Sequence, residues 1–367
     1  MKKNLFILAA AALCFAACSS DETIAVNEGL ADANTISFRP LNDGVTRATE
    51  KTSSFSADDE IKVWATKGAS PYFNNATFTY AAAGYAGFSS NPPYYWPSTI
   101  DASDNKMTFY ATYAGNQTTA GNISTFSPDD DAADQVNLLC AKLEYTAKPS
   151  AGEAILTFKH ALSEVIVKVK NSNANLKITV SKVKVGYVAK TGALAFTTGS
   201  PVWTNTNPTN TATDVYSQTL TSDLELTSSP QTLTGTKPWM ILPQNLALNQ
   251  TAPAMVYTKA YKTSTQGTAA SDANLNCAYI ALELVFQDAT TNAEVVAKQW
   301  CYWPILDNWQ AGKKYTYIID ASQGGYQPTN VDEDEDLDKV LEGLEIRFNT
   351  STSIEAWVVE DDIAVAM

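Results

Sequence analysis

The feature that most constrains the fold is an alternation of apolar and polar residues, repeated in short segments along most of the chain. Ile61 and Val63 flank a lysine, and the same spacing recurs at Val183 and Val185. Because successive side chains of a strand point to opposite faces, this period of two is typical of strands with one buried face. No long apolar run with the helical period of 3.6 residues is present. The chain is therefore predicted to be all-β.

The predicted strands form two series of about seven strands each, separated by the polar stretch 171–175. This organisation predicts two β-sandwiches in tandem, one over residues 48–172 and one over residues 173–367. The first series covers residues 35–38, 60–65, 77–80, 94–97, 107–113, 136–145 and 154–169, where the last segment is one bent strand or two joined strands. The second series covers residues 178–188, 192–196, 215–220, 239–242, 255–261, 278–286, 294–302 and 315–319.

The N-terminal residues have the pattern of a secretory signal. Lys2 and Lys3 precede an apolar stretch over residues 5–17, which is too short to cross a bilayer, and Cys18 follows two alanines. This arrangement resembles a bacterial lipobox, in which the new N-terminal cysteine is acylated. Residues 1–17 are thus predicted to be a lipoprotein signal peptide, and Cys18 the lipid attachment site. An ordinary signal peptide with an incidental cysteine is the alternative.

The residues after Cys18 and the overall charge narrow the location and the partners. Residues 19–22 resemble the acidic tag of Bacteroidetes lipoproteins at the outer surface, which predicts an outer-membrane, cell-surface location with a lipid tether over residues 18–47. The formal net charge is −14 at pH 7, and loss of Lys2 and Lys3 makes it more negative. Such an acidic surface repels nucleic acid, so no nucleic-acid partner is expected.

The sequence offers no set of residues for catalysis, metal binding or a cofactor. His160 is the only histidine, which excludes a multi-histidine zinc site, and its segment reads as a strand. The acidic run 331–339 has Leu337 where a calcium loop needs glycine and Gly343 where it needs glutamate, so it is interpreted as a solvated linker. We predict that the chain is not an enzyme, with no catalytic residue, no metal site and no cofactor.

Three cysteines remain after the signal region, at positions 140, 277 and 301. A bridge between Cys277 and Cys301 is one option. The hairpin predicted near residues 288–294 places Cys301 opposite Ile280 instead, which favours buried thiols.

Several short segments, taken together and in order, resemble the fimbrillin family, the pilins of the type V pilus of Bacteroidetes. The most specific piece is Leu-Thr-Phe-Lys-His-Ala-Leu-Ser over residues 156–163. The other pieces are Cys18 with its signal and residues 46–48, 55–61, 95–97, 109–111, 138–141, 241–244 and 309–315.

The resemblance implies two transthyretin-like, Greek-key β-sandwich domains and a polymerising shaft or tip subunit of a fimbrium that supports adhesion. It also implies a trypsin-like or arginine-specific protease that cleaves between Arg47 and Ala48. Cleavage there would remove the strand that carries Ile36 and Phe38. The alternative is that Arg47 is an ordinary surface arginine in a turn.

The C-terminus is apolar and alternating, which is unusual for the end of a soluble chain. We expect it to donate the strand that links subunits, so that the partners are other pilin subunits, with the same chain or minor pilins as candidates. The alternative is that the tail pairs within its own second sandwich. The predicted donor residues are Ile354, Ala356, Val358, Ile363, Val365 and Met367.

Two other functions stay open at this point. One is a monomeric surface lipoprotein that binds a glycan or a host protein, and a host or bacterial surface ligand is also a candidate partner of a pilin. The other is a β-sandwich glycosidase or protease, although no pair of carboxylates is singled out among the 39 acidic residues.

Overall fold

The computed structural model describes residues 34–42, 55–81, 87–150, 152–204, 215–233, 238–246, 278–305, 307–323 and 350–356. These residues form strands and one 3₁₀ turn, which confirms the all-β prediction. The elements are β1 (Ser37–Asn42), β2 (Glu60–Lys67), β3 (Ser70–Ala81), β4 (Gly87–Ser89), β5 (Met107–Tyr113), β6 (Asn122–Phe126), β7 (Leu139–Tyr145), β8 (Glu153–His160), β9 (Ser163–Lys170), β10 (Leu176–Gly186), β11 (Gly192–Ala195), β12 (Val202–Thr204), β13 (Val215–Glu225), β14 (Gln231–Thr232), β15 (Trp239–Ile241), β16 (Tyr279–Asp288), β17 (Glu294–Pro304), β18 (Lys313–Asp320), η2 (Ala321–Gln323) and β19 (Thr350–Ala356). No helix among them is long and apolar enough to span a membrane.

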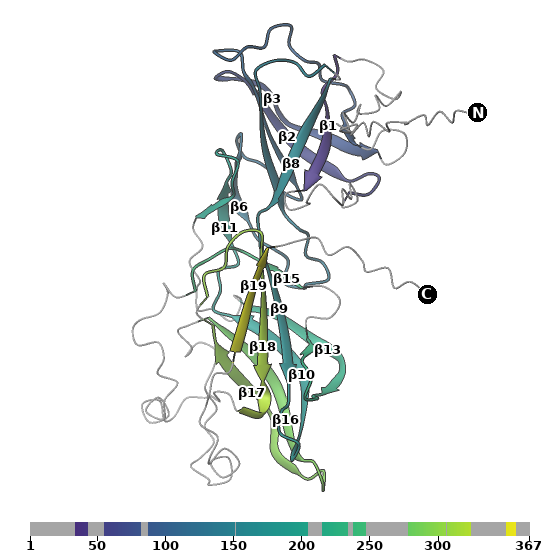
Figure 1. Cartoon of the computed structure of the whole chain (residues 1–367), viewed down its shortest axis with the longest axis vertical. Helices are drawn as coiled ribbons and strands as arrows, with labels where there is room; N and C mark the ends of the chain where they lie inside the picture. Colours follow the sequence, from purple (N-terminus) through teal and green to yellow (C-terminus); the bar gives the residue numbers. More distant parts are fainter. Residues whose placement is uncertain are drawn as a thin grey trace, which may run out of the picture.

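The first series of strands closes into a barrel at one end of an elongated molecule (Figure 1). The strand order is β1-β4-β3-β2-β5-β7-β8, and β1 completes the ring by pairing with both β4 and β8. An open sandwich was the expectation from the sequence. The difference arises because β1 covers the two edges that an open sandwich would leave unpaired.

The barrel core follows the alternation in the sequence. Ile61, Val63 and Ala65 of β2 are fully buried, and aromatic rings from several strands fill the space between them. Trp96 is buried as well, and its indole Nε1 donates a hydrogen bond to the carbonyl oxygen of Gly152 at 2.8 Å. Residues 94–97, expected as a short strand, make only an isolated bridge between Tyr95 and Thr35.

The second series forms a sandwich of two sheets over one core. One sheet has the order β13-β10-β16-β17 and the other the order β14-β9-β18-β19, with β15 also paired to β9. Val165 and Val167 of β9 and Ile280 and Leu282 of β16 belong to the same buried cluster. The two sheets therefore pack face to face, as expected for this part of the chain.

A small third sheet, β12-β11-β6, lies between the barrel and the sandwich (Figure 1). Strand β6 belongs to the first half of the sequence but pairs with β11 from the second half, and the alternation in the sequence did not indicate it. Leu138, just before β7, and Cys140, on β7, share a buried cluster with Leu162 and Leu194. This cluster connects the two halves of the molecule.

The segment 154–169 is two strands that belong to different sheets. β8 ends at His160 in the barrel, β9 begins at Ser163 in the sandwich, and the two residues between them are buried. The chain thus changes from barrel to sandwich between β8 and β9, whereas the domain boundary in the sequence was placed at residues 172–173.

The hairpin of β16 and β17 differs in register from the expectation. Cys301 lies opposite Leu282 and not opposite Ile280, because the register shifts twice between Leu284 and Gln287. Cys301 is buried, and Cys277 lies outside the described residues, so the question of a bridge stays open. Cys140 is a free buried thiol, and burial raises the pKa of this thiol to about 12. Such a thiol is unreactive at neutral pH.

Candidate functional site

The first strand, β1, lies where two different ladders meet. It runs parallel to β8, with Phe38 opposite Ala154, and antiparallel to β4, with Phe38 opposite Phe88. The residues before it are also held, because the backbone amide of Ile36 donates to the carbonyl oxygen of Tyr94 at 2.7 Å. Residues 34–42 therefore act as a structural strand of the barrel and not as a loose extension.

The side chains of β1 fill the centre of the barrel. Ile36 is 2% exposed and Phe38 is 0% exposed, as expected for the strand that carries them. The ring of Phe38 packs edge-to-face against Phe78 and Phe109, with centroids 4.9 Å and 5.3 Å apart. Burial of each such side chain stabilises the fold by about 1.5–3 kcal/mol. Loss of β1 would expose this apolar groove and the edges of β4 and β8.

A charged pair lies beside the groove. The guanidinium Nε of Arg39 on β1 is 3.3 Å from the carboxylate Oε1 of Glu153, the first residue of β8. The Glu153 side chain is 8% exposed, while the Arg39 side chain is 27% exposed. Sequence reasoning missed this pair, because its partners are 114 positions apart and no local pattern marks them.

Most of the other predicted site residues lie outside the described residues. These are Cys18, Arg47, Ala48, Val358, Ile363, Val365 and Met367. Ile354 and Ala356 lie on β19, where they are opposite Tyr315 and Lys313 of β18 in the same chain. Within this single chain, the described part of the tail is thus paired in its own sandwich, and a role as donor stays a prediction.

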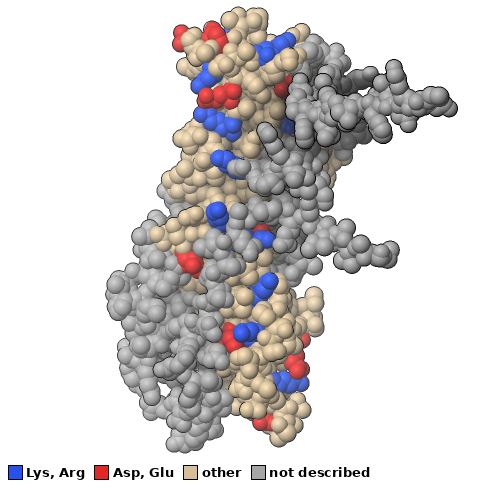
Figure 2. All heavy atoms as spheres, viewed as in Figure 1, with Lys and Arg blue, Asp and Glu red and all other residues tan. Residues whose placement is uncertain are grey.

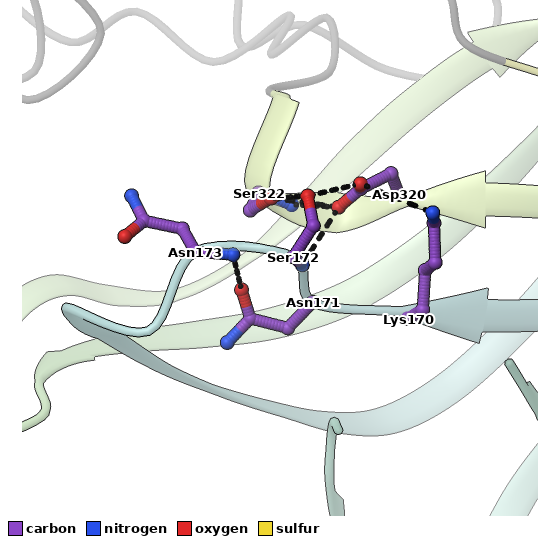
Figure 3. Close-up of polar contacts among 6 residues, drawn as sticks. All are labelled: Lys170, Asn171, Ser172, Asn173, Asp320 and Ser322. Atoms are coloured by element: carbon purple, nitrogen blue, oxygen red, sulfur yellow. Dashed lines mark hydrogen bonds and ion pairs between the residues drawn. The ribbon is translucent and has the colours of Figure 1, made fainter. Parts of the chain in front are cut away.

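A polar cluster fixes the end of the sandwich where β9 and β18 finish (Figure 3). The carboxylate of Asp320 accepts hydrogen bonds from the backbone amides and hydroxyls of Ser172 and Ser322. Lys170 approaches from the other side, with its Nζ 3.7 Å from Asp320 Oδ2. Burial acts to raise the pKa of Asp320, but these hydrogen bonds hold the pKa below its ordinary value. The cluster ties η2 to the loop after β9.

Asp320 is expected to make the sandwich sensitive to acid. Its pKa is lower in the folded chain than in the unfolded chain. Its contribution to stability is therefore present above the ordinary aspartate pKa and is lost as the pH falls through the lowered value. We expect Asp320→Asn to lower the free energy of unfolding at pH 7 by about 2 kcal/mol, since hydrogen bonds to a charged acceptor are lost. Urea denaturation at several pH values measures this, and an unchanged pH dependence in the variant would contradict it.

His160 ends β8 at the barrel side of the connection to β9. The residue is 8% exposed, and its ring Nδ1 lies 2.8 Å from the side-chain amide nitrogen of Asn137. The residue therefore belongs to a buried strand end, and the absence of a catalytic or metal role stays a prediction. Among the residues that the structure describes, no three His, Cys, Asp or Glu side chains cluster as a metal site would.

The described surface carries no concentrated charge on the face shown in Figure 2. On that face, lysine and arginine side chains are interspersed with aspartate and glutamate side chains, some of them in contact, and neither charge gathers into a large patch. The groove filled by β1, with Glu153 at its margin, is therefore the candidate site that the described residues support best. A groove of this kind can bind an extended peptide segment as an added strand.

The chain is similar to one protein family and to several solved structures. The profile of the fimbrillin-like family matches residues 46–335. None of the curated proteins matches the chain. Among solved structures, a candidate cell adhesion protein from Bacteroides uniformis is 15% identical, with a TM-score of 0.47, and the match covers 89% of this chain and 98% of the other. A similar candidate from Bacteroides ovatus is 18% identical, with a TM-score of 0.48 and coverages of 89% and 99%. A fimbrial protein from Bacteroides ovatus is 14% identical, with a TM-score of 0.31 and coverages of 80% and 50%.

Proposed function

We propose a specific role for this chain, which belongs to the fimbrillin-like family: it is a shaft or tip subunit of a type V pilus on the cell surface. Membership of the family confirms the resemblance found in the sequence. The family consists of structural proteins that assemble with other pilin subunits, so the chain is a structural protein and not an enzyme.

The chain reaches the outer membrane as a lipoprotein anchored through Cys18, and a protease then cleaves after Arg47. The observation that carries this proposal is the place of β1. This strand closes the barrel and fills its core, yet it precedes Arg47 in the sequence. A cut at Arg47 would separate the strand, together with the lipid, from the rest of the barrel.

Loss of β1 prepares the subunit for polymerisation. The edges of β4 and β8 would then present unpaired backbone groups beside an apolar groove, which is a template for another strand. A strand from the C-terminal region of a second subunit restores both the ladder and the core. The predicted donor is the segment from Ile354 to Met367. Because donor and acceptor are different surfaces, the contacts are heterologous and build a filament.

The N-terminus of the protein isolated from the cell surface tests the proposal. We expect mass spectrometry and N-terminal sequencing of assembled material to find a chain that begins at Ala48, while unassembled precursor retains acylated Cys18. A surface protein that keeps acylated Cys18 throughout and stays monomeric would instead support the lipoprotein that binds a glycan or a host protein. For a pilin, a host or bacterial surface ligand remains a further proposed partner.

A further inference from the structure

Strand β8 forms one wall of the groove, and β1 is its main ladder partner. The parallel pairing with β1 covers six positions of β8, residues 153–158. On its other side, β8 pairs with β7 only at Lys159 and His160, in the part of the chain that the structure describes. The backbone amide of Ile155 also donates to the hydroxyl of Tyr145 at 3.2 Å. Removal of β1 would therefore leave most of β8 without a backbone ladder, and such a segment opens locally at low cost.

The start of β8 also depends on the N-terminal residues. Trp96 donates its indole N–H to the carbonyl oxygen of Gly152, which directly precedes β8. The backbone around Trp96 is itself held by residues that would leave with β1. Its amide donates to the carbonyl oxygen of Asn34 at 2.7 Å, and the carbonyl oxygen of Tyr94 accepts from the amide of Ile36. Processing would remove both contacts, so the start of β8 would lose support as well.

The other end of β8 is fixed by contacts that processing leaves in place. Beyond β8 the chain continues through Ala161 and Leu162, here called the β8–β9 junction, into the sandwich (Figure 1). The backbone amide of Gly312 donates to the carbonyl oxygen of Leu162 at 2.8 Å. The hydroxyl of Ser163, the first residue of β9, donates to the carbonyl oxygen of Gln310 at 2.9 Å. The turn before β18 therefore holds the sandwich side of the junction.

The small third sheet holds the junction from another direction. Trp203 on β12 donates its indole Nε1–H to the carbonyl oxygen of Ala161 at 2.6 Å. The ring of Trp203 lies against Phe126 of β6, with centroids 6.0 Å apart, and packs on the buried cluster that contains Leu162. Ala161 is fully buried, so loss of this donor would leave a carbonyl oxygen without that bond and without water to replace it.

These contacts bear differently on the precursor and on the processed subunit. In the precursor, the ladder with β1 holds β8 along its length, and the junction adds one more restraint. Without β1, the junction is the main restraint on β8 that remains. A groove wall that is already in place costs an incoming strand less ordering free energy than one that must first be folded back.

We propose that Trp203 is a positioning residue for strand exchange: it holds the β8–β9 junction, so that β8 stays in place as the wall of the open groove after β1 has left. The inference rests on the proposed strand exchange and assigns a function within it to the small third sheet. This sheet pairs with neither the barrel nor the sandwich, yet it carries the side chain that fixes the connection between them.

Hydrogen–deuterium exchange of β8, before and after cleavage at Arg47, tests the proposal. Trp203→Phe keeps an aromatic ring but removes the indole N–H donor. In the precursor, we expect the variant to raise the exchange rate of the β8 amides by less than about threefold, because β1 still holds them. After cleavage and loss of the N-terminal peptide, verified by mass, we expect a rise of about tenfold or more over the unmodified processed chain. Filament yield, measured by sedimentation, should fall by a similar factor.

Trp64→Phe is the matched control. Trp64 lies on β2 and is partly buried, as Trp203 is, but its indole nitrogen has no hydrogen-bond partner within the described ranges. We expect this variant to change the exchange of β8 by less than about threefold in either state. Ser163→Ala removes the hydroxyl that donates to Gln310 and is expected to act as Trp203→Phe does. It takes the place of Trp203→Phe if that variant does not fold.

The outcomes separate this inference from the function on which it rests. If Trp203→Phe raised the exchange of β8 by the same factor before and after cleavage, its role would be general stability, and the inference would be overturned. Equal exchange rates and filament yields for the variant and the unmodified processed chain would overturn it as well. An unmodified chain that keeps its N-terminal peptide after cleavage, or that fails to polymerise, would overturn the strand-exchange function itself, whatever the junction variants do.

Discussion

A chain with alanine at Arg47 is expected to remain a full-length precursor and to form no filaments. Without the cut, β1 stays covalently attached and keeps its place between β4 and β8. An intramolecular strand competes at a high effective concentration, so a donor strand from solution cannot displace it. Ile36 and Phe38 add about 1.5–3 kcal/mol each to the retained strand by their burial. We therefore expect a complete loss of filament assembly, and not only slower assembly.

The measurement combines the mass of the membrane-associated protein with electron microscopy of the cell surface. Arg47→Lys is the matched variant: a trypsin-like protease still cuts it, whereas an arginine-specific protease does not. Normal filaments built from Arg47→Ala subunits would show that β1 is not the strand whose removal permits assembly. A processed N-terminus at another residue would show that the cleavage site is elsewhere.

The sequence predicted the strands well where one face is buried. Ile61 and Val63 alternate with polar residues and are fully buried, and the alternation of Ile36 and Phe38 likewise predicted a strand. Strand β6 was missed, because a strand of five residues in a small sheet between two larger units has little need of a continuous apolar face. The local alternation of apolar and polar residues thus predicts which segments are extended, but not which strands pair with one another.

The features that depend on distant pairing could not be predicted. Closure of the barrel requires β1 to meet β8, and the ion pair beside it joins Arg39 to Glu153 across 114 positions. The cluster around Asp320 depends in the same way on Ser172, 148 positions earlier in the chain. Serine and aspartate in loops are common, so only the folded structure distinguishes these residues from solvated ones. The sequence therefore predicted the apolar residues of the candidate site, but not its charged residues.

The second large effect is expected from Phe38→Ala, and it should differ before and after processing. In the precursor, Phe38 is fully buried between Phe78 and Phe109, so its truncation is expected to lower the free energy of unfolding by about 3–5 kcal/mol. If processing removes β1 as proposed, Phe38 is absent from the processed subunit and a donor strand takes its place. Once cleaved, the variant should therefore polymerise as the unmodified chain does.

Phe78→Ala is the matched control, because Phe78 packs against the same ring but remains in the barrel after cleavage. It is expected to destabilise the precursor by a similar amount and also to weaken the groove for the incoming strand. Urea denaturation of both precursors and filament yield after cleavage give the two readouts, and Phe38→Leu substitutes if the alanine precursor does not fold. If Phe38→Ala lowered filament yield as strongly as Phe78→Ala, the first strand would have to remain in the assembled subunit. Because a retained strand leaves no groove to fill, that single result would contradict strand exchange at this site, whichever segment is the donor.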